Sequence, residues 1–138
     1  MNSRGDQSVL KELEELLSRD PPGRVFRMGE SLHIHLSEST FLIVSPTWLE
    51  VTICKPHVRI GEHEDEEATI KAIITDFRLG LGARLLERGW REVDISTTET
   101  TMADKSTASQ TVTEVVSRID IGDAKAAFDE IMWLKSRV

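Results

Sequence analysis

Two histidines with one residue between them are the side chains best placed to do chemistry. His33 and His35 alternate with the apolar residues Leu32, Ile34 and Leu36, which is the period of a β-strand. Alternate side chains of a strand point to the same side, so both imidazoles could bind one metal ion. A third ligand would come from a neighbouring strand or loop, where the available residues are Glu50, Glu92, His57 and His63.

The same alternation has a simpler explanation, in which the histidines form the solvated side of an amphipathic strand. The three apolar residues require the core face, and His33 and His35 then point outward by default. No further donor follows at a spacing typical of metal sites. A metal-binding protein or metal-dependent enzyme that uses His33 and His35 is therefore the alternative function, and we expect no cofactor.

The single cysteine, Cys54, bears on both cellular location and catalysis. An internal disulfide is excluded, and a cytoplasmic location is expected. A nucleophilic cysteine needs a histidine neighbour and a lowered pKa. His57 is close in sequence, but Pro56 intervenes and no third residue orients it. We expect Cys54 to be structural, and the sequence assigns no catalytic residue.

Two other segments resemble binding motifs but lack the residues that define them. The acidic run from Glu62 to Glu67 does not have the spacing of a calcium loop, and its carboxylates are expected at the start of a helix, where the dipole favours them. Gly80 and Gly82 are not followed by the third glycine of a dinucleotide loop, since position 85 is Leu85, and no strand leads into them.

The concentrated basic group is a set of four arginines, and it supports the second alternative, a nucleic-acid accessory factor. No tyrosine exists, and no aromatic residue alternates with this group. The net charge of −7 repels phosphate backbones and anionic lipid. We therefore expect salt-bridged arginines, no nucleic-acid partner and no membrane contact. The four residues are Arg78, Arg84, Arg88 and Arg91.

The N-terminal residues and the longest apolar run point to the same conclusion about membranes. Residues 1–6 are polar and contain no apolar segment typical of a signal peptide. The run Phe41–Val44 is far too short to span a bilayer. Side-chain amides are scarce beside many charged residues, which is a composition found in heat-adapted proteins.

The period of the apolar residues predicts a single α+β domain over residues 1–138. The expected element order is α-β-β-β-α-β-β-α, with a mainly antiparallel sheet and helices packed on one face. The helices are expected at 9–19, 64–88 and 123–136, and the strands at 26–36, 41–45, 49–54, 92–95 and 112–121. The other face of the sheet should carry His33, His35, Glu50, Thr52, Glu92 and Asp94.

Several local features leave alternatives open. Gly29 marks either a bulge or a turn that makes residues 25–28 a separate strand. Residues 57–60 form at best a short edge strand after Pro56. The glycines at 80 and 82 predict a kink, or a break near Leu79. Residues 1–7 are expected to be disordered, and residues 97–111 to form either a long Ser/Thr-rich loop or the tip of a hairpin that pairs with a partner.

The function that remains is a non-enzymatic protein–protein interaction module, such as an adaptor, an assembly factor or a small chaperone-like protein, in the form of a homodimer. The element order and the acidity are similar to those of small dimeric secretion chaperones, a similarity of fold without a shared motif. Trp133 and Met132 on the last helix, together with Trp48, are the expected interface anchors. The expected partner is another protein, itself, or both.

Overall fold

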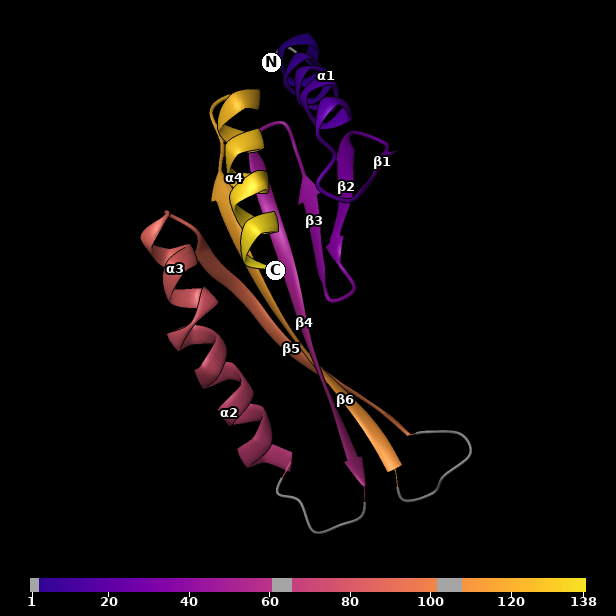
Figure 1. The fold of residues 1–138 in the computed structure, drawn as a ribbon, viewed down its shortest axis with the longest axis vertical. Helices are drawn as coiled ribbons and strands as arrows, with labels where there is room; N and C mark the ends of the chain where they lie inside the picture. The colour runs from indigo at the N-terminus through magenta and orange to yellow at the C-terminus, as the bar shows by residue number, and fades with distance from the viewer. Residues whose placement is uncertain (1–2, 61–65, 102–107) are drawn as a thin grey trace.

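The computed structural model describes residues 3–60, 66–101 and 108–138. Its six strands form one antiparallel sheet in the order β1-β2-β3-β4-β6-β5 (Figure 1), which confirms the predicted α+β fold and element order. The elements are α1 Ser3–Arg19, β1 Arg24–Met28, β2 Ser31–Ser37, β3 Thr40–Val44, β4 Trp48–Ile60, α2 Glu66–Leu79, α3 Leu81–Glu87, β5 Arg91–Thr101, β6 Ala108–Asp120 and α4 Ala124–Arg137.

The first part of the sheet is a hairpin followed by a meander. Gly29 adopts a φ of +61°, which glycine tolerates better than any other residue, and it turns the chain between β1 and β2. Residues Val25–Met28 therefore belong to a strand of their own, paired with β2. The turns that follow are short, so β2, β3 and β4 lie side by side as antiparallel neighbours.

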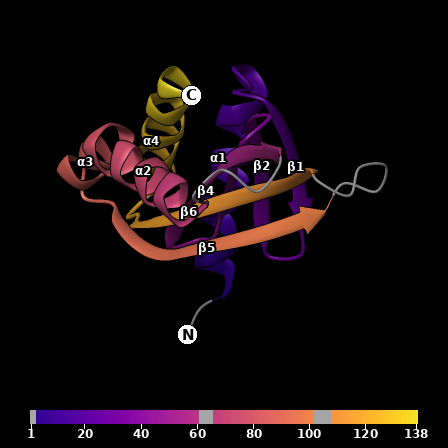
Figure 2. The ribbon, with the colours of Figure 1, turned by 90° about the horizontal axis from the view of Figure 1, so that it is seen from below.

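One face of the sheet is covered by helices. Alternate residues of β2, β3, β4 and β6 join the buried side chains of the helices in one apolar core. Helix α4 contributes Ala127, Ile131 and Leu134, and α1 contributes three leucines at helical spacing. Figure 2 shows α2, α3 and α4 on the same side of β5 and β6. The predicted stripes of both terminal helices thus form the core.

Three strands are much longer than the others and run on beyond β3 (Figure 1). Strand β3 begins at Thr40, which pairs with Ile53, and the Cys54 N–H donates to the Ser39 carbonyl over 2.7 Å just before that strand. From Lys55 onward β4 pairs with β6 alone among the described strands. Pro56 lies in this part of β4, where no described strand pairs with its other side and the missing N–H costs little. Residues 57–60 are therefore a continuation of β4 at a local edge, and not a separate strand.

The helix predicted at 64–88 is broken in two. Gly80 separates α2 from α3 with a φ of −97° and a ψ of −108°, which confirms the predicted break near Leu79. Gly82 lies against Phe77, and a Cβ added there would lie 2.8 Å from the Phe77 carbonyl oxygen. Gly89, with a φ of +97°, follows the end of α3 as predicted.

The structure differs from the predictions in the start of the first helix, in the extent of the last two strands, and in the side of the sheet on which Glu92 lies. Helix α1 begins at Ser3, well before Val9. The Ser/Thr-rich segment is mostly strand, because β5 continues to Thr101 and β6 starts at Ala108; residues 102–107 lie outside the described residues. The prediction that Glu92 shares the open face with Asp94 is wrong, because Val93 is an extra residue in a β-bulge and shifts the alternation.

Candidate functional site

The face of the sheet that no described helix covers, which we call the open face, carries apolar and aromatic side chains on β1, β2 and β3 and an ion pair between Glu50 and Arg118 on β4 and β6. The register places side chains from all six strands there in cross-strand rows. His33 is half-buried and His35 is exposed on this face, as predicted. The half-buried apolar side chains of the open face are Phe26, Phe41, Ile43, Trp48, Val112 and Val116.

The two histidines are part of an aromatic cluster. The ring of Phe26 stacks on His33 and meets His35 edge-on, each with 5.6 Å between centroids. Phe41 lies 5.6 Å from His35 on the other side. The cross-strand pairs that place these rings together are Phe26 with His33 and His35 with Phe41. The imidazoles are thus held among phenyl rings, which supply no metal ligand.

The structure does not bring the proposed third ligands to the histidines. Glu50 is separated from His33 by Ile43 in the same cross-strand row and accepts a hydrogen bond from Arg118 over 2.6 Å. Glu92 and His57 lie on the helix-covered face, and His63 is outside the described residues. In the part of the chain that the structure describes, no three His, Cys, Asp or Glu side chains are grouped to hold a metal. Metal binding by His33 and His35 stays a prediction.

Cys54 lies half-buried on the open face beside Glu114, its cross-strand partner. Burial raises the pKa of the Cys54 thiol, and the charge of Glu114 raises it further. His57 pairs with the buried Thr111 on the opposite face of β4. The two side chains therefore cannot act as a nucleophile and its base.

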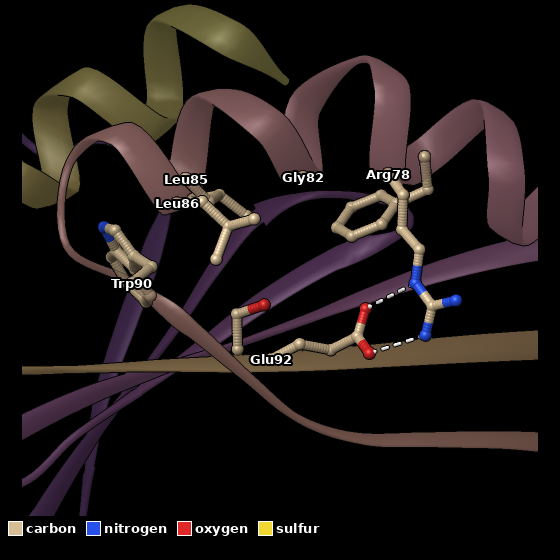
Figure 3. A pocket seen from close by; sticks show the side chains of 8 residues that line it. Arg78, Gly82, Leu85, Leu86, Trp90 and Glu92 are labelled. Carbon is tan, nitrogen blue, oxygen red and sulfur yellow. Dashed lines mark hydrogen bonds and ion pairs between the residues drawn. The ribbon is translucent and has the colours of Figure 1, made fainter.

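An apolar slot lies on the other face, between α3 and the sheet, and sequence reasoning did not find it (Figure 3). Its volume is about 220 Å³. Leu85 and Leu86 point into it from α3, and Trp90 closes one end. The remaining lining comes from Phe77, Arg78, Gly82, Glu92 and Ser117. Engineered apolar cavities of about 150 Å³ hold a benzene ring, so this slot has room for one bulky apolar side chain.

An ion pair lies at the rim of the slot. Arg78 of α2 donates to both carboxylate oxygens of Glu92 on β5, over 3.2 and 2.8 Å. Figure 3 shows this pair beside the leucines of α3. The bulge at Val93 makes the contact possible, because it turns Glu92 toward the helices.

A second carboxylate fixes the position of Trp90. Glu130 on α4 accepts hydrogen bonds from the Trp90 indole over 2.8 Å and from Arg88 over 2.7 and 2.8 Å. Burial raises the pKa of Glu130, but the hydrogen bonds from Arg88 and Trp90 and the charge of Arg88 outweigh it, so the pKa lies below its ordinary value. This network joins α3, the start of β5 and α4.

Among the described residues, no strand pairs with the outer edge of β5, and three exposed apolar side chains come from β5 and from the helices that precede it. Strand β5 is last in the sheet order. Leu79, Leu86 and Val93 are exposed by 77, 64 and 44%, respectively, and come from α2, α3 and β5. Of the three, Leu86 also lines the slot, and we call Leu86 and the slot together the apolar shoulder.

Comparisons with protein-family models, with curated proteins and with solved structures find no match. Among the described residues, no helix combines the length and apolar character needed to cross a membrane. The site must therefore be interpreted from its own geometry.

Three of the four arginines of the predicted basic group contact carboxylates. Arg78 pairs with Glu92, Arg88 with Glu130, and Arg91 with Asp120 over 3.5 Å. Arg84 is exposed. Their charge is thus largely compensated on the protein itself, as the salt-bridged interpretation expected.

The predicted interface anchors are half-buried rather than fully solvated. Trp133 packs against the core, with the guanidinium of Arg88 4.5 Å from its ring centroid. Trp48 has the guanidinium of Arg118 4.4 Å from its ring centroid, and Met132 is half-buried. Their role as interface anchors stays a prediction.

Proposed function

We propose that the protein is a non-enzymatic interaction module, an adaptor, assembly factor or small chaperone-like protein, that works in the cytoplasm as a homodimer and binds an extended segment of its partner along β5. The observation that carries this proposal is the free edge of β5 beside an apolar slot. An exposed strand edge offers unpaired N–H and C=O groups to another chain. Side chains of the added strand would supply specificity.

The two outermost strands of the sheet differ in a way that favours β5, and the local edge of β4 carries Lys55 and Pro56. In natural proteins an edge strand is kept from pairing with another chain by its short length or by lysines, prolines or bulges. Strand β1 is short and carries Arg24 and Arg27. Strand β5 has a bulge only at Val93, and from Ile95 to Thr101 it contains no lysine and no proline. An edge of this length without such protection is suited to strand addition.

The apolar shoulder supports the same surface. A strand added to β5 turns alternate side chains toward the helix-covered face, where Leu86 and the mouth of the slot lie. A bulky apolar residue of the partner would bury its side chain in the slot and gain about 1.5–3 kcal/mol. The partner segment should therefore be extended and carry one such residue.

Peptide selection on the purified protein tests the proposal. Random peptides displayed on phage would be selected on the wild type and counter-selected on a proline variant of β5. Successive backbone N–H groups of a strand point to opposite sides, so one of Thr97→Pro and Thr98→Pro breaks the ladder with β6 and lowers the unfolding temperature. The other removes only an outward N–H, and it is the variant to use.

We expect selected peptides to alternate, to carry a bulky apolar residue, and to shift the NMR signals of β5 amides and of the Trp90 indole. Replacing that residue by alanine should weaken binding about tenfold or more. The function would be abandoned if peptides bound both proline variants as well as the wild type, or if the shifted amides lay away from β5.

A further inference from the structure

We propose that two copies of this chain associate by packing their open faces together, about a two-fold axis that lies between the sheets and runs along the strands. The inference rests on the homodimer in the proposed function and names its surface. It leaves the β5 edge free for the partner segment.

The first argument is the composition of the open face. Phe26, Phe41 and Ile43 lie there beside the two histidines, and each is only half-covered. Val116 lies beyond Thr52 in the row of Phe41, and the Glu50–Arg118 ion pair follows Ile43 in the neighbouring row. All four helices bury their side chains in the core on the other side, and Figure 2 shows three of them there. The apolar and aromatic side chains on β1, β2 and β3 are thus a partly exposed patch on a face that no described helix covers, which suits a protein contact.

The second argument is the distribution of charge along one cross-strand row. The row begins with a cation on β1, passes through an imidazole and through apolar and hydroxyl side chains, and ends with an anion on β5. Its residues, in sheet order, are Arg24, His35, Phe41, Thr52, Val116 and Asp94. Arg24 and Asp94 are both exposed, and Asp94 forms no ion pair with any residue that the structure describes.

This charge distribution selects one symmetry. A two-fold axis along the strands, midway between β3 and β4, reverses the row and places Arg24 of one copy opposite Asp94 of the other, twice. Phe41 of each copy then faces Thr52 of the other. An axis perpendicular to the strands would instead place Arg24 opposite Arg24, which like charges oppose. Packed sheets lie roughly 10 Å apart with their strands nearly aligned, as this arrangement requires.

The area predicts the strength of the contact. Six strands about 4.8 Å apart, with about six residues of each at a rise of about 3.3 Å per residue, give roughly 600 Å² of open face per copy. Standard interfaces bury about 800 Å² per partner, and smaller ones are weak or transient. The expected dimer is therefore micromolar, and its mass should depend on concentration in that range.

A charge swap tests the contact directly. Arg24→Asp and Asp94→Arg should each raise the dissociation constant at least tenfold in sedimentation, because each places like charges together twice. An equimolar mixture of the two variants restores both opposite-charge pairs, and its constant should return to within about threefold of the wild type. Arg84→Asp and Glu87→Arg on α3 make the same charge changes outside the open face and should leave the mass unchanged.

Cross-linking provides a second readout. Cys54, the only cysteine, lies on the open face half a strand spacing from the proposed axis, so the two Cα atoms should be roughly 11 Å apart. A short bismaleimide should link wild-type copies and the mixed variants, but neither variant alone. A Phe41→Glu variant, which places an anion at the centre of the contact, should be monomeric with unchanged circular dichroism.

The alternatives give different results. If the charge-swap variants left the dissociation constant of the dimer unchanged, and the β5 proline variant that removes only an outward N–H were monomeric, the face-to-face contact would be overturned. The homodimer itself would stand. A monomer at all concentrations that still binds selected peptides along β5 would overturn the contact and the homodimer, but not the interaction function.

Discussion

The indole N–H of Trp90 donates a hydrogen bond to Oε1 of Glu130 over 2.8 Å, although the two residues lie far apart in the sequence. Trp90 is fully buried at the start of β5, and Glu130 projects from the final helix. Arg88 completes the contact with both oxygens of the same carboxylate. This one side chain therefore fixes α4 against the helix–strand turn that forms one end of the slot.

Replacing Glu130 by glutamine should destabilise the protein. A hydrogen bond to a charged group contributes about 1.5–3 kcal/mol, and the partial exposure of Arg88 reduces its share. We expect the free energy of unfolding at neutral pH to fall by about 1–3 kcal/mol, measured by urea denaturation. Glu12→Gln, on the exposed side of α1, is the matched control and should change it by less than about 0.5 kcal/mol.

The stability difference between the wild type and Glu130→Gln should also depend on pH. The folded-state pKa of Glu130 lies below its ordinary value of 4.5, so its stabilisation is fully present above that pH and is lost as the pH falls through the folded-state pKa. The stability difference between the wild type and Glu130→Gln should shrink below pH 4.5. A difference that stayed constant down to pH 3 would show that the carboxylate charge is not what matters.

Gly82 should be needed for the packing of α2 on α3. An added Cβ would lie 2.8 Å from the Phe77 carbonyl oxygen and 3.0 Å from its ring. Overpacking of this kind costs about 1–3 kcal/mol, which exceeds the gain in helix propensity of up to about 1 kcal/mol. Gly82→Ala should lower the unfolding temperature, whereas Gly122→Ala, with nothing within 4 Å of its added Cβ, should not. Equal temperatures for both variants would contradict the tight contact.

Local periodicity predicted most of the fold, because burial on one face leaves a direct trace in the sequence. The alternation around His33 and His35 gave the correct outward facing. The Thr-rich arms of the β5–β6 hairpin left no such trace, since threonine occurs on both faces: Thr111 and Thr113 are buried while Thr97 and Thr98 are exposed. Periodicity fails where both sides of a strand carry the same residue type.

The candidate sites were predicted less well than the fold, because they depend on side chains that only tertiary packing brings together. The slot combines Phe77, Trp90 and Ser117 from three elements, and no short pattern joins them. One extra residue, Val93, was enough to move Glu92 from the open face to the rim of the slot. A bulge of this kind has no sequence signal in a run as short as Glu92–Ile95.

Cys54 should react slowly with maleimides for an electrostatic reason. Burial and the charge of Glu114 raise the pKa of its thiol, and only the thiolate is nucleophilic. Glu114→Gln should lower the pKa and increase the alkylation rate at neutral pH, measured on dilute protein by mass spectrometry. Glu12→Gln on the exposed side of α1 is the matched control. Identical rates for the two variants would mean that burial alone controls the thiol.

Zinc titration of the metal-free protein addresses the remaining role of His33 and His35. Their rings contact Phe26 and Phe41, and the nearest carboxylate in their row, Glu50, is held by Arg118. A site with only two imidazoles binds zinc weakly, since tight protein sites use three or four ligands. We expect calorimetry to give an affinity weaker than micromolar that His33→Ala hardly changes. A nanomolar 1:1 complex that is lost in His33→Ala would establish a metal site and require a third ligand outside the described residues, for which His63 is the first to replace.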